Sequence, residues 1–137
     1  MNENLRQYIE NEIFPLYQKN EQGHQLKHIQ YVIQRSLLFA DQFENINKNM
    51  VYTIAAFHDL AHHIDRKKHE ILSAEMFYNN VKMQEFFTPF ERLIIKEAIE
   101  DHRASSTLKP RSDYGKIISS ADRTTSVETA IRRTYHY

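Results

Sequence analysis

A histidine and an aspartate stand side by side, as His58-Asp59, directly after the apolar run from Met50 to Phe57. Burying a carboxylate without a partner costs several kcal/mol, and a bound metal ion is one of the few partners that removes this cost. Neighbouring residues on a helix point about 100° apart, so both side chains can reach one ion that lies between them. The pair therefore predicts a metal site. Its structural alternative is a core histidine that is hydrogen-bonded to a core aspartate.

Further candidate ligands lie in separate segments of the chain. Asp122 continues the apolar stripe of the segment from about Asp113 to Arg123, so we expect its carboxylate to point inward. His28 stands where the apolar face of the segment from about Gln25 to Phe43 begins. The alternatives are an N-cap role for Asp122 and a partly exposed structural role for His28. Two imidazoles and two carboxylates suit Fe(II), Mn(II), Zn(II), Co(II) or Ni(II) better than Ca(II), with Mg(II) a weaker option.

The composition excludes several other kinds of protein. The 137 residues suffice for one domain, and a hydrophobic fraction of 41% is ordinary for a globular protein. No cysteine occurs, which excludes disulfides, thiolate metal sites and a cysteine nucleophile. Lys+Arg and Asp+Glu both number 18, so the net charge does not indicate nucleic acid or an anionic membrane as a partner. The polar N-terminus and the lack of a long apolar stretch lead us to expect a cytoplasmic protein without membrane contact.

The elements that must position these residues are helices. Only two glycines and three prolines occur, which is too few for the many tight turns of an all-β fold. We expect an all-α fold, one domain over residues 1–137 with its core at about 23–123, built as a single compact bundle of about six to seven helices. The expected helices are Asn4 to Lys19 with a kink or end at Pro15, Gln25 to Phe43 after a break at Gly23, Lys48 to Asp65, one opened by His69, one after Thr88, and Asp113 to Arg123.

The clearest local pattern is Thr88-Pro89-Phe90-Glu91. Threonine at the N-cap, proline at the first helical position and glutamate at the third predict a capping box with a pre-set first turn. The helix that begins here ends at His102. Helical propensity continues to the last residue, Tyr137, so either a further helix follows or the last segment frays.

The order of His28, His58-Asp59 and Asp122 resembles the HD-domain superfamily of metal-dependent phosphohydrolases, which is named for the adjacent pair. The resemblance covers the chain from about Gly23 to Arg123. It implies an enzyme that hydrolyses a phosphoester or phosphoanhydride bond in a small nucleotide-like molecule. The implied cofactor is one or two divalent transition-metal ions.

Some members of that superfamily carry two more histidines between the pair and the last aspartate, and these members bind a second metal. His69 and His102 occupy such positions, and on this interpretation Asp59 bridges two ions. The local alternative uses His62 and His63, which lie four residues after the adjacent pair and share its helical faces. We favour His69, because the family places its extra ligand on the next helix. His62 and His63 then become candidates for proton transfer.

Three cations near the predicted site are candidates for binding a substrate phosphate. Arg103 follows His102, and Lys109 and Arg111 form a basic loop just beyond. Their alternative is an ordinary solvated surface charge. A metal in such a shell lowers the pKa of bound water to about 7 and polarises a phosphoryl oxygen, so attack by metal-activated hydroxide is the simplest mechanism. Asp59, His62 and His63 are the predicted catalytic residues.

Two other classes of function remain open at this stage. One is a catalytically silent metal- or nucleotide-binding module that acts as a sensor or dimerising domain. The other is a helical bundle whose histidines serve packing alone. The partner expected on the enzyme interpretation is a small phosphorylated metabolite or nucleotide, with a homodimer as an additional option.

Overall fold

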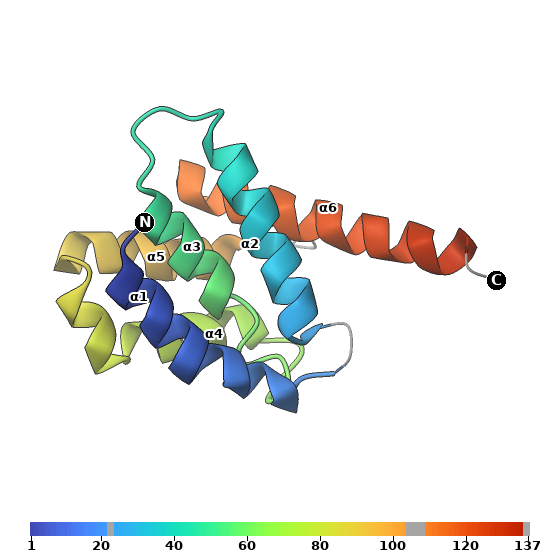
Figure 1. Cartoon of the computed structure of the whole chain (residues 1–137), viewed down its shortest axis with the longest axis horizontal. Coiled ribbons are helices and arrows are strands. Elements are labelled where there is room, and N and C mark those ends of the chain that lie inside the picture. The colour runs from blue at the N-terminus through green and yellow to red at the C-terminus, as the bar shows by residue number, and fades with distance from the viewer. Residues whose placement is uncertain (22–23, 104–108, 136–137) are drawn as a thin grey trace.

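The computed structural model describes the chain except residues 22–23, 104–108 and 136–137, with side chains described up to residue 125. Within that part of the chain every regular element is a helix, which confirms the all-α class (Figure 1). The elements are α1 (Glu3–Tyr8), a π-helix η1 (Ile9–Ile13), a 3-10 helix η2 (Phe14–Lys19), α2 (Leu26–Ala40), α3 (Lys48–Phe57), α4 (His69–Tyr78), a 3-10 helix η4 (Val81–Glu85), α5 (Pro89–Asp101) and α6 (Asp113–Tyr135).

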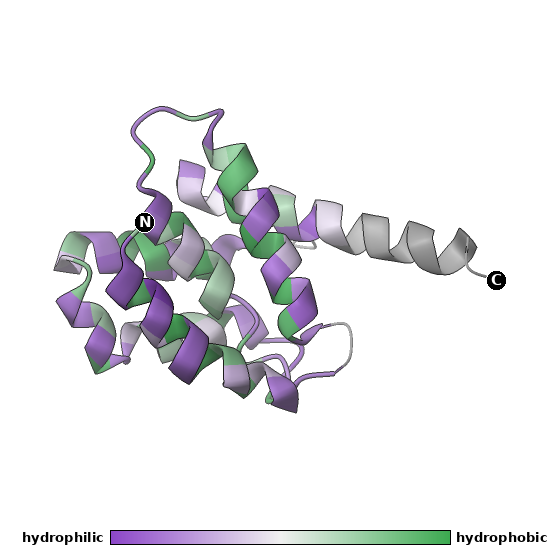
Figure 2. Ribbon diagram, viewed as in Figure 1, coloured by the Kyte–Doolittle hydropathy of each residue, from purple (hydrophilic) through white to green (hydrophobic). Residues whose placement is uncertain are grey.

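The central element is α3. All of its residues from Met50 to Phe57 are buried, as the apolar run predicts. The helices α2, α4, α5 and α6 pack around it. Figure 2 shows hydrophobic residues along much of α3, whereas the outer helix α1 is mostly hydrophilic. The end of α3 therefore lies where segments from distant parts of the sequence meet.

The first predicted helix, Asn4 to Lys19, forms as three successive helical segments; the predicted change at Pro15 is present, but the α-helix already ends at Tyr8. The chain forms α1, then the wider π-turn η1, in which the backbone N–H of Phe14 donates to the carbonyl of Ile9. The 3-10 helix η2 follows, with Pro15 in its first turn. Proline lacks an N–H and clashes with the carbonyl four residues before it, so a regular α-helix cannot continue through this position.

The predicted helix from Lys48 to Asp65 is wrong in its second half. It ends at Phe57, with His58 as its C-cap, and residues 58–64 form a series of turns. The adjacent pair therefore stands at a helix end and in the turn after it. His62 and His63 consequently do not share helical faces with the pair.

Side chains from other elements explain this early end. The hydroxyl of Tyr17 donates to the carbonyl of Ala56 at 2.6 Å, and the backbone N–H of Ala61 donates to Oγ of Ser73 at 3.0 Å. In a continuing α-helix the carbonyl of Ala56 would accept from the N–H of Leu60, and the N–H of Ala61 would donate to the carbonyl of Phe57. Because tertiary partners satisfy them instead, the chain can turn without leaving buried polar groups unpaired.

The predictions for the later helices are mostly confirmed. In α5, Oγ1 of Thr88 accepts from the N–H of Glu91 at 3.1 Å and the Glu91 carboxylate accepts from the N–H of Thr88 at 2.9 Å, which is the predicted capping box. The last helix, α6, runs beyond its predicted end at Arg123 to Tyr135. The predicted break at Gly23 lies outside the described residues. None of the described helices is both long and apolar enough to cross a membrane.

Candidate metal centre

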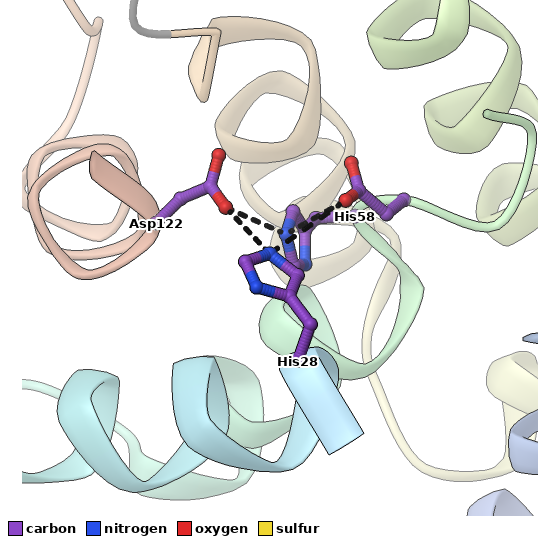
Figure 3. Close-up of side chains that lie close together, drawn as sticks. His28, His58 and Asp122 are labelled. Carbon is purple, nitrogen blue, oxygen red and sulfur yellow. Dashed lines mark hydrogen bonds and ion pairs between the residues drawn. The ribbon is translucent and has the colours of Figure 1, made fainter. Parts of the chain in front are cut away.

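Four of the predicted ligands converge from α2, the end of α3, the turn after it and α6. His28, His58, Asp59 and Asp122 each offer one donor atom within 4.8 Å of the others, and we call this group site A. Oδ1 of Asp122 lies 3.1 Å from Nε2 of His28 and 3.5 Å from Nε2 of His58. Figure 3 shows these three side chains pointing toward one another.

A second group, site B, consists of Asp59, His69 and His102. Oδ1 of Asp59 lies 3.2 Å from Nε2 of His69 and 3.6 Å from Nε2 of His102. The other carboxylate oxygen, Oδ2, faces site A, at 3.7 Å from Nε2 of His58 and 3.9 Å from Nε2 of His28. Asp59 thus presents one oxygen to each site. The structure brings together all six residues that the sequence predicts as metal ligands.

Backbone carbonyls hold three of the imidazoles in one orientation. In each case the Nδ1 atom faces the carbonyl of the residue three positions earlier. The Nδ1···O distances are 2.7 Å from His58 to Ala55, 3.0 Å from His69 to Arg66 and 2.6 Å from His102 to Ile99. A carbonyl only accepts, so Nδ1 carries the hydrogen and Nε2 is left free to ligate. Proteins orient metal-binding histidines in this way.

The donor atoms fit a divalent cation. The Nε2 atoms of His69 and His102 face each other at 3.2 Å. With both rings neutral and their hydrogens on Nδ1, two lone pairs meet at this distance, which is repulsive unless a metal ion or a proton lies between them. Asp59 outweighs burial and raises the pKa of His69, which favours such a proton when no metal is bound. Nε2 of His58 is buried and has no hydrogen-bond partner among the described residues. Mixed imidazole and carboxylate donors at both sites suit a transition-metal ion.

The charges of the centre shift its pKa values strongly. Burial lowers the pKa of His58, but the charges of Asp59 and Asp122 outweigh it and raise the pKa from 6.5 to about 9. Burial raises the pKa of Asp59, but the charge of His58 and hydrogen bonds from neighbouring imidazoles hold it well below its usual value. Burial raises the pKa of Asp122, but the imidazoles of His28 and His58, at 3.1 and 3.5 Å from its Oδ1, hold it well below its usual value. Without a metal, a proton therefore takes the cation's place on His58.

His24 belongs to the centre, although sequence analysis did not select it. Its Nδ1 lies 2.9 Å from Oδ2 of Asp59, and its ring stacks on that of His62 with centroids 3.5 Å apart. The side chain is 35% exposed, so it is more open to solvent than the ligand histidines. His24 precedes His28 by four residues, a spacing that places two side chains on one helical face and could have indicated a shared site. His24 was not selected because it lies between the expected break at Gly23 and the expected start of the helix at Gln25, where periodicity gives no information.

The two other predicted catalytic histidines differ in their surroundings. His62 is buried, and its ring centroid lies 4.9 Å from that of His69. Burial and the nearby His24 lower the pKa of His62 to about 4, so the ring is neutral at pH 7. His63 is exposed and its Nδ1 lies 2.9 Å from Oδ1 of Asn20. Among the described residues neither joins a group of potential metal ligands, and His69 occupies the place that they would have taken.

The three predicted phosphate-binding cations also differ from one another. The guanidinium of Arg103 lies 3.4 Å from the carboxylate of Glu70. Glu70 is the residue that follows the site B ligand His69 in the sequence. The guanidinium of Arg111 instead pairs with Asp101 at 2.9 Å and with Glu100 at 2.7 Å. These contacts differ from the predicted phosphate role, because carboxylates at the end of α5 already engage its donors. Lys109 is exposed and forms no ion pair with another described residue.

A comparison of the sequence with known families agrees with this geometry. The model of the HD domain matches residues 26–126. The chain belongs to the HD-domain family. This match contains all six predicted ligands of the two sites, from His28 to Asp122.

The fold of this HD-domain protein also has a counterpart of known structure. A crystal structure of a predicted HD superfamily hydrolase from an uncultured Thermotogales bacterium superposes with a TM-score of 0.70, covering 98% of this chain and 82% of that chain. The two sequences are 22% identical, so the likeness concerns the fold alone. No curated protein matches the sequence.

Proposed function

We propose that this HD-domain protein is a metal-dependent phosphohydrolase, which cleaves a phosphoester or phosphoanhydride bond in a small nucleotide-like substrate. Membership of the family supports hydrolysis, and the two groups of donors support dependence on metal. The observation that carries the proposal is the place of Asp59, whose two carboxylate oxygens face different sites. Such an arrangement suits two ions that act on one phosphoryl group.

The residues of the chain prepare the centre for its cofactor. When bound, divalent transition-metal ions supply Lewis acidity to a phosphoryl oxygen and lower the pKa of a bound water molecule. Site A would hold its ion with His28, His58, Asp59 and Asp122, and site B with Asp59, His69 and His102. The three carbonyl-anchored imidazoles need little reorientation, which favours binding.

His62 is our candidate for moving a proton during the reaction. Its ring lies against His24 and against the site B ligand His69, and it belongs to neither site. The ring is neutral at pH 7 and can accept a proton, and its buried Nδ1 has no hydrogen-bond partner among the described residues. Since the ring of His63 is bonded to Asn20, we rank His63 below His62 for this role.

We propose that Arg103 contributes most to binding the substrate phosphate, since its guanidinium lies beside Glu70 next to site B. Lys109, exposed at the edge of the loop, is a second candidate. The partner would be a small phosphorylated metabolite or nucleotide in the cytoplasm. We also propose that the protein forms a homodimer.

The test begins with protein purified without a histidine tag and without a nickel column. We expect up to two metal ions per chain by elemental analysis, and hydrolysis of at least one compound in a panel of nucleoside phosphates, dinucleoside polyphosphates and cyclic dinucleotides with Mn(II) or Fe(II). Turnover that survives Asp59→Ala would contradict the catalytic role of the centre. Tight nucleotide binding without turnover by metal-loaded protein would favour the silent sensor module instead.

A further inference from the structure

A buried asparagine connects the N-terminal segment to the metal centre. Asn20 follows η2 directly and its residue is 4% exposed. Its Nδ2 donates to the backbone carbonyl of Asp59 at 2.8 Å and to that of His24 at 3.0 Å. Its Oδ1 accepts from the backbone N–H of His63 at 3.0 Å and from the His63 ring at 2.9 Å. These four contacts use both donors and both lone pairs of the carboxamide.

Asp59 depends on such contacts because it lies outside regular helix. Residues 58–64 are turns, so helical pairing does not fix the peptide groups on either side of the Asp59 side chain. The carbonyl of Asp59 accepts from Nδ2 of Asn20 and, within the turn, from the N–H of His62 at 3.1 Å, and the N–H of Asp59 donates to the hydroxyl of Tyr17 at 3.4 Å. Tyr17 lies in the last turn of η2, and Asn20 is the residue that caps its C-terminal end. This end of η2 therefore holds the backbone of the shared ligand.

We propose that Asn20 is a positioning residue for the metal centre. By holding the carbonyls of Asp59 and His24 together, it directs the Asp59 carboxylate so that one oxygen reaches each site. The inference rests on the metal centre of the proposed function and is independent of the reaction. Site B depends on it most, because Asp59 supplies one of three donors there and one of four in site A.

The test compares Asn20→Ala with Asn80→Ala. Asn80 also joins two segments, since its Nδ2 donates to the hydroxyl of Tyr8 at 3.1 Å and its Oδ1 accepts from the N–H of Lys82 at 2.9 Å. Within the described part of the chain, none of these bonds reaches a metal ligand. Both variants are titrated with Mn(II), and electron paramagnetic resonance separates coupled ion pairs from isolated ions. Thermal unfolding of the metal-free proteins reports the loss of stability.

We expect Asn20→Ala to bind the second Mn(II) roughly 10- to 100-fold more weakly and to lose the signal of the coupled pair. Asn80→Ala should keep the affinity for the second Mn(II) and the signal of the coupled pair, even if its melting temperature falls as far as that of Asn20→Ala. The inference would be overturned if Asn20→Ala kept the coupled signal and bound the second Mn(II) as tightly as the wild type. It would also be overturned if the wild-type protein bound one ion only. An equal loss of the second ion in Asn80→Ala would also overturn it, since general destabilisation would then suffice.

A milder variant covers the case in which Asn20→Ala does not fold. Tyr17→Phe keeps the buried ring and removes only the hydroxyl that contacts Ala56 and Asp59. We expect a weaker second site here too, with a smaller change, and an unchanged second affinity would count against the inference. Activity plays no part in these measurements. A wild type that binds two coupled ions and hydrolyses nothing would reject the proposed function while leaving the role of Asn20 intact.

Discussion

Sites A and B share Asp59 but are built in different ways. Site A contains two carboxylates and two imidazoles, and its closest contact joins opposite partners, Nε2 of His28 and Oδ1 of Asp122 at 3.1 Å. Site B contains one shared carboxylate, and two of its donor nitrogens, on His69 and His102, face each other at 3.2 Å. A proton can satisfy either site when no metal is present, because nearby carboxylates outweigh burial and raise the pKa of His58 in site A and that of His69 in site B. The sites differ in charge, since site A has the carboxylate of Asp122 in addition to the shared one of Asp59.

The two sites also differ in how the chain assembles them. Site A draws on α2 and α6, so its ligands come from positions as far apart as residues 28 and 122. Site B draws on the start of α4 and the end of α5, two helices that pack against each other. The bundle must therefore be complete before site A forms. A local change at the contact of α4 and α5 is enough to disturb site B.

The largest expected effect comes from the residue that the sites share. Asp59→Asn keeps the size of the side chain and removes the charge that faces both sites, so we expect loss of the ion at site B and much weaker binding at site A, where His28, His58 and Asp122 remain. Activity should fall by more than the roughly 10- to 100-fold that accompanies loss of a residue supporting a ligand. Metal analysis and turnover with Mn(II) measure the two effects. The control is Asp41→Asn, at an exposed aspartate paired with Lys48, which should change neither quantity.

Single imidazole deletions separate the sites. We expect His102→Ala to remove one equivalent of metal, because site B then retains only Asp59 and His69. We expect His28→Ala to retain a weaker site A with three remaining donors, and to leave site B occupied. Calorimetric titration of metal-free protein with Mn(II) gives the stoichiometry and both affinities. Two full equivalents in His102→Ala would mean that site B, as defined here, does not bind the ion.

The pH dependence of metal binding should distinguish site A. The pKa of His58 is about 9 without metal, so a proton occupies its ring over the neutral range and an ion must displace it. Affinity at site A should therefore rise from pH 6 to pH 9. The stability of the metal-free protein should change in the opposite direction, because a raised histidine pKa stabilises below the unfolded value of 6.5 and loses that contribution as the pH rises through about 9.

Asp59 and Asp122 affect the stability of the metal-free protein at acidic pH. Their lowered pKa values stabilise the fold above the ordinary value of 3.8 and lose this contribution as the pH falls further. We expect the metal-free protein to be most stable between these limits, and Mn(II) to raise the melting temperature more at pH 9 than at pH 6. Thermal unfolding with and without a chelator measures both trends. In His58→Gln, the decline of metal-free stability between pH 6 and pH 9 should become smaller, and the raised pKa of His69 should account for what remains.

Four ligand residues could be predicted from their local sequence, because His28, His58, Asp59 and Asp122 are polar groups within or beside an apolar stripe. His69 and His102 could be predicted only from the resemblance to the family. The capping box at Thr88 was equally local, and it is present as expected. Such features need only neighbouring residues for their interpretation.

What could not be predicted depends on contacts between distant residues. The early end of α3 follows from the hydroxyls of Tyr17 and Ser73, which lie far from Ala56 and Ala61 in the sequence. His24 was missed because its role arises from a contact with Asp59 and not from its own segment. Arg111 resembled a free cation in sequence, but the fold places three carboxylates of α5 around it. Tertiary partners decided each of these cases.

The smallest effect is expected where the two arginines near site B are compared. Arg103 lies beside Glu70, next to the ligand His69, so Arg103→Ala should raise KM with little change in stability. Arg111 is 49% exposed and its ion pairs are partly screened, so Arg111→Ala should lower stability by about 1 kcal/mol or less and leave KM unchanged. Thr88→Ala, at the other end of α5, costs about 1 kcal/mol through loss of its cap and serves as a stability control. A higher KM in Arg111→Ala, but not in Thr88→Ala, would contradict this expectation. The guanidinium of Arg111 would then have to leave the carboxylates of α5 to bind the substrate phosphate. In that case the phosphate site would extend from site B toward the start of α6.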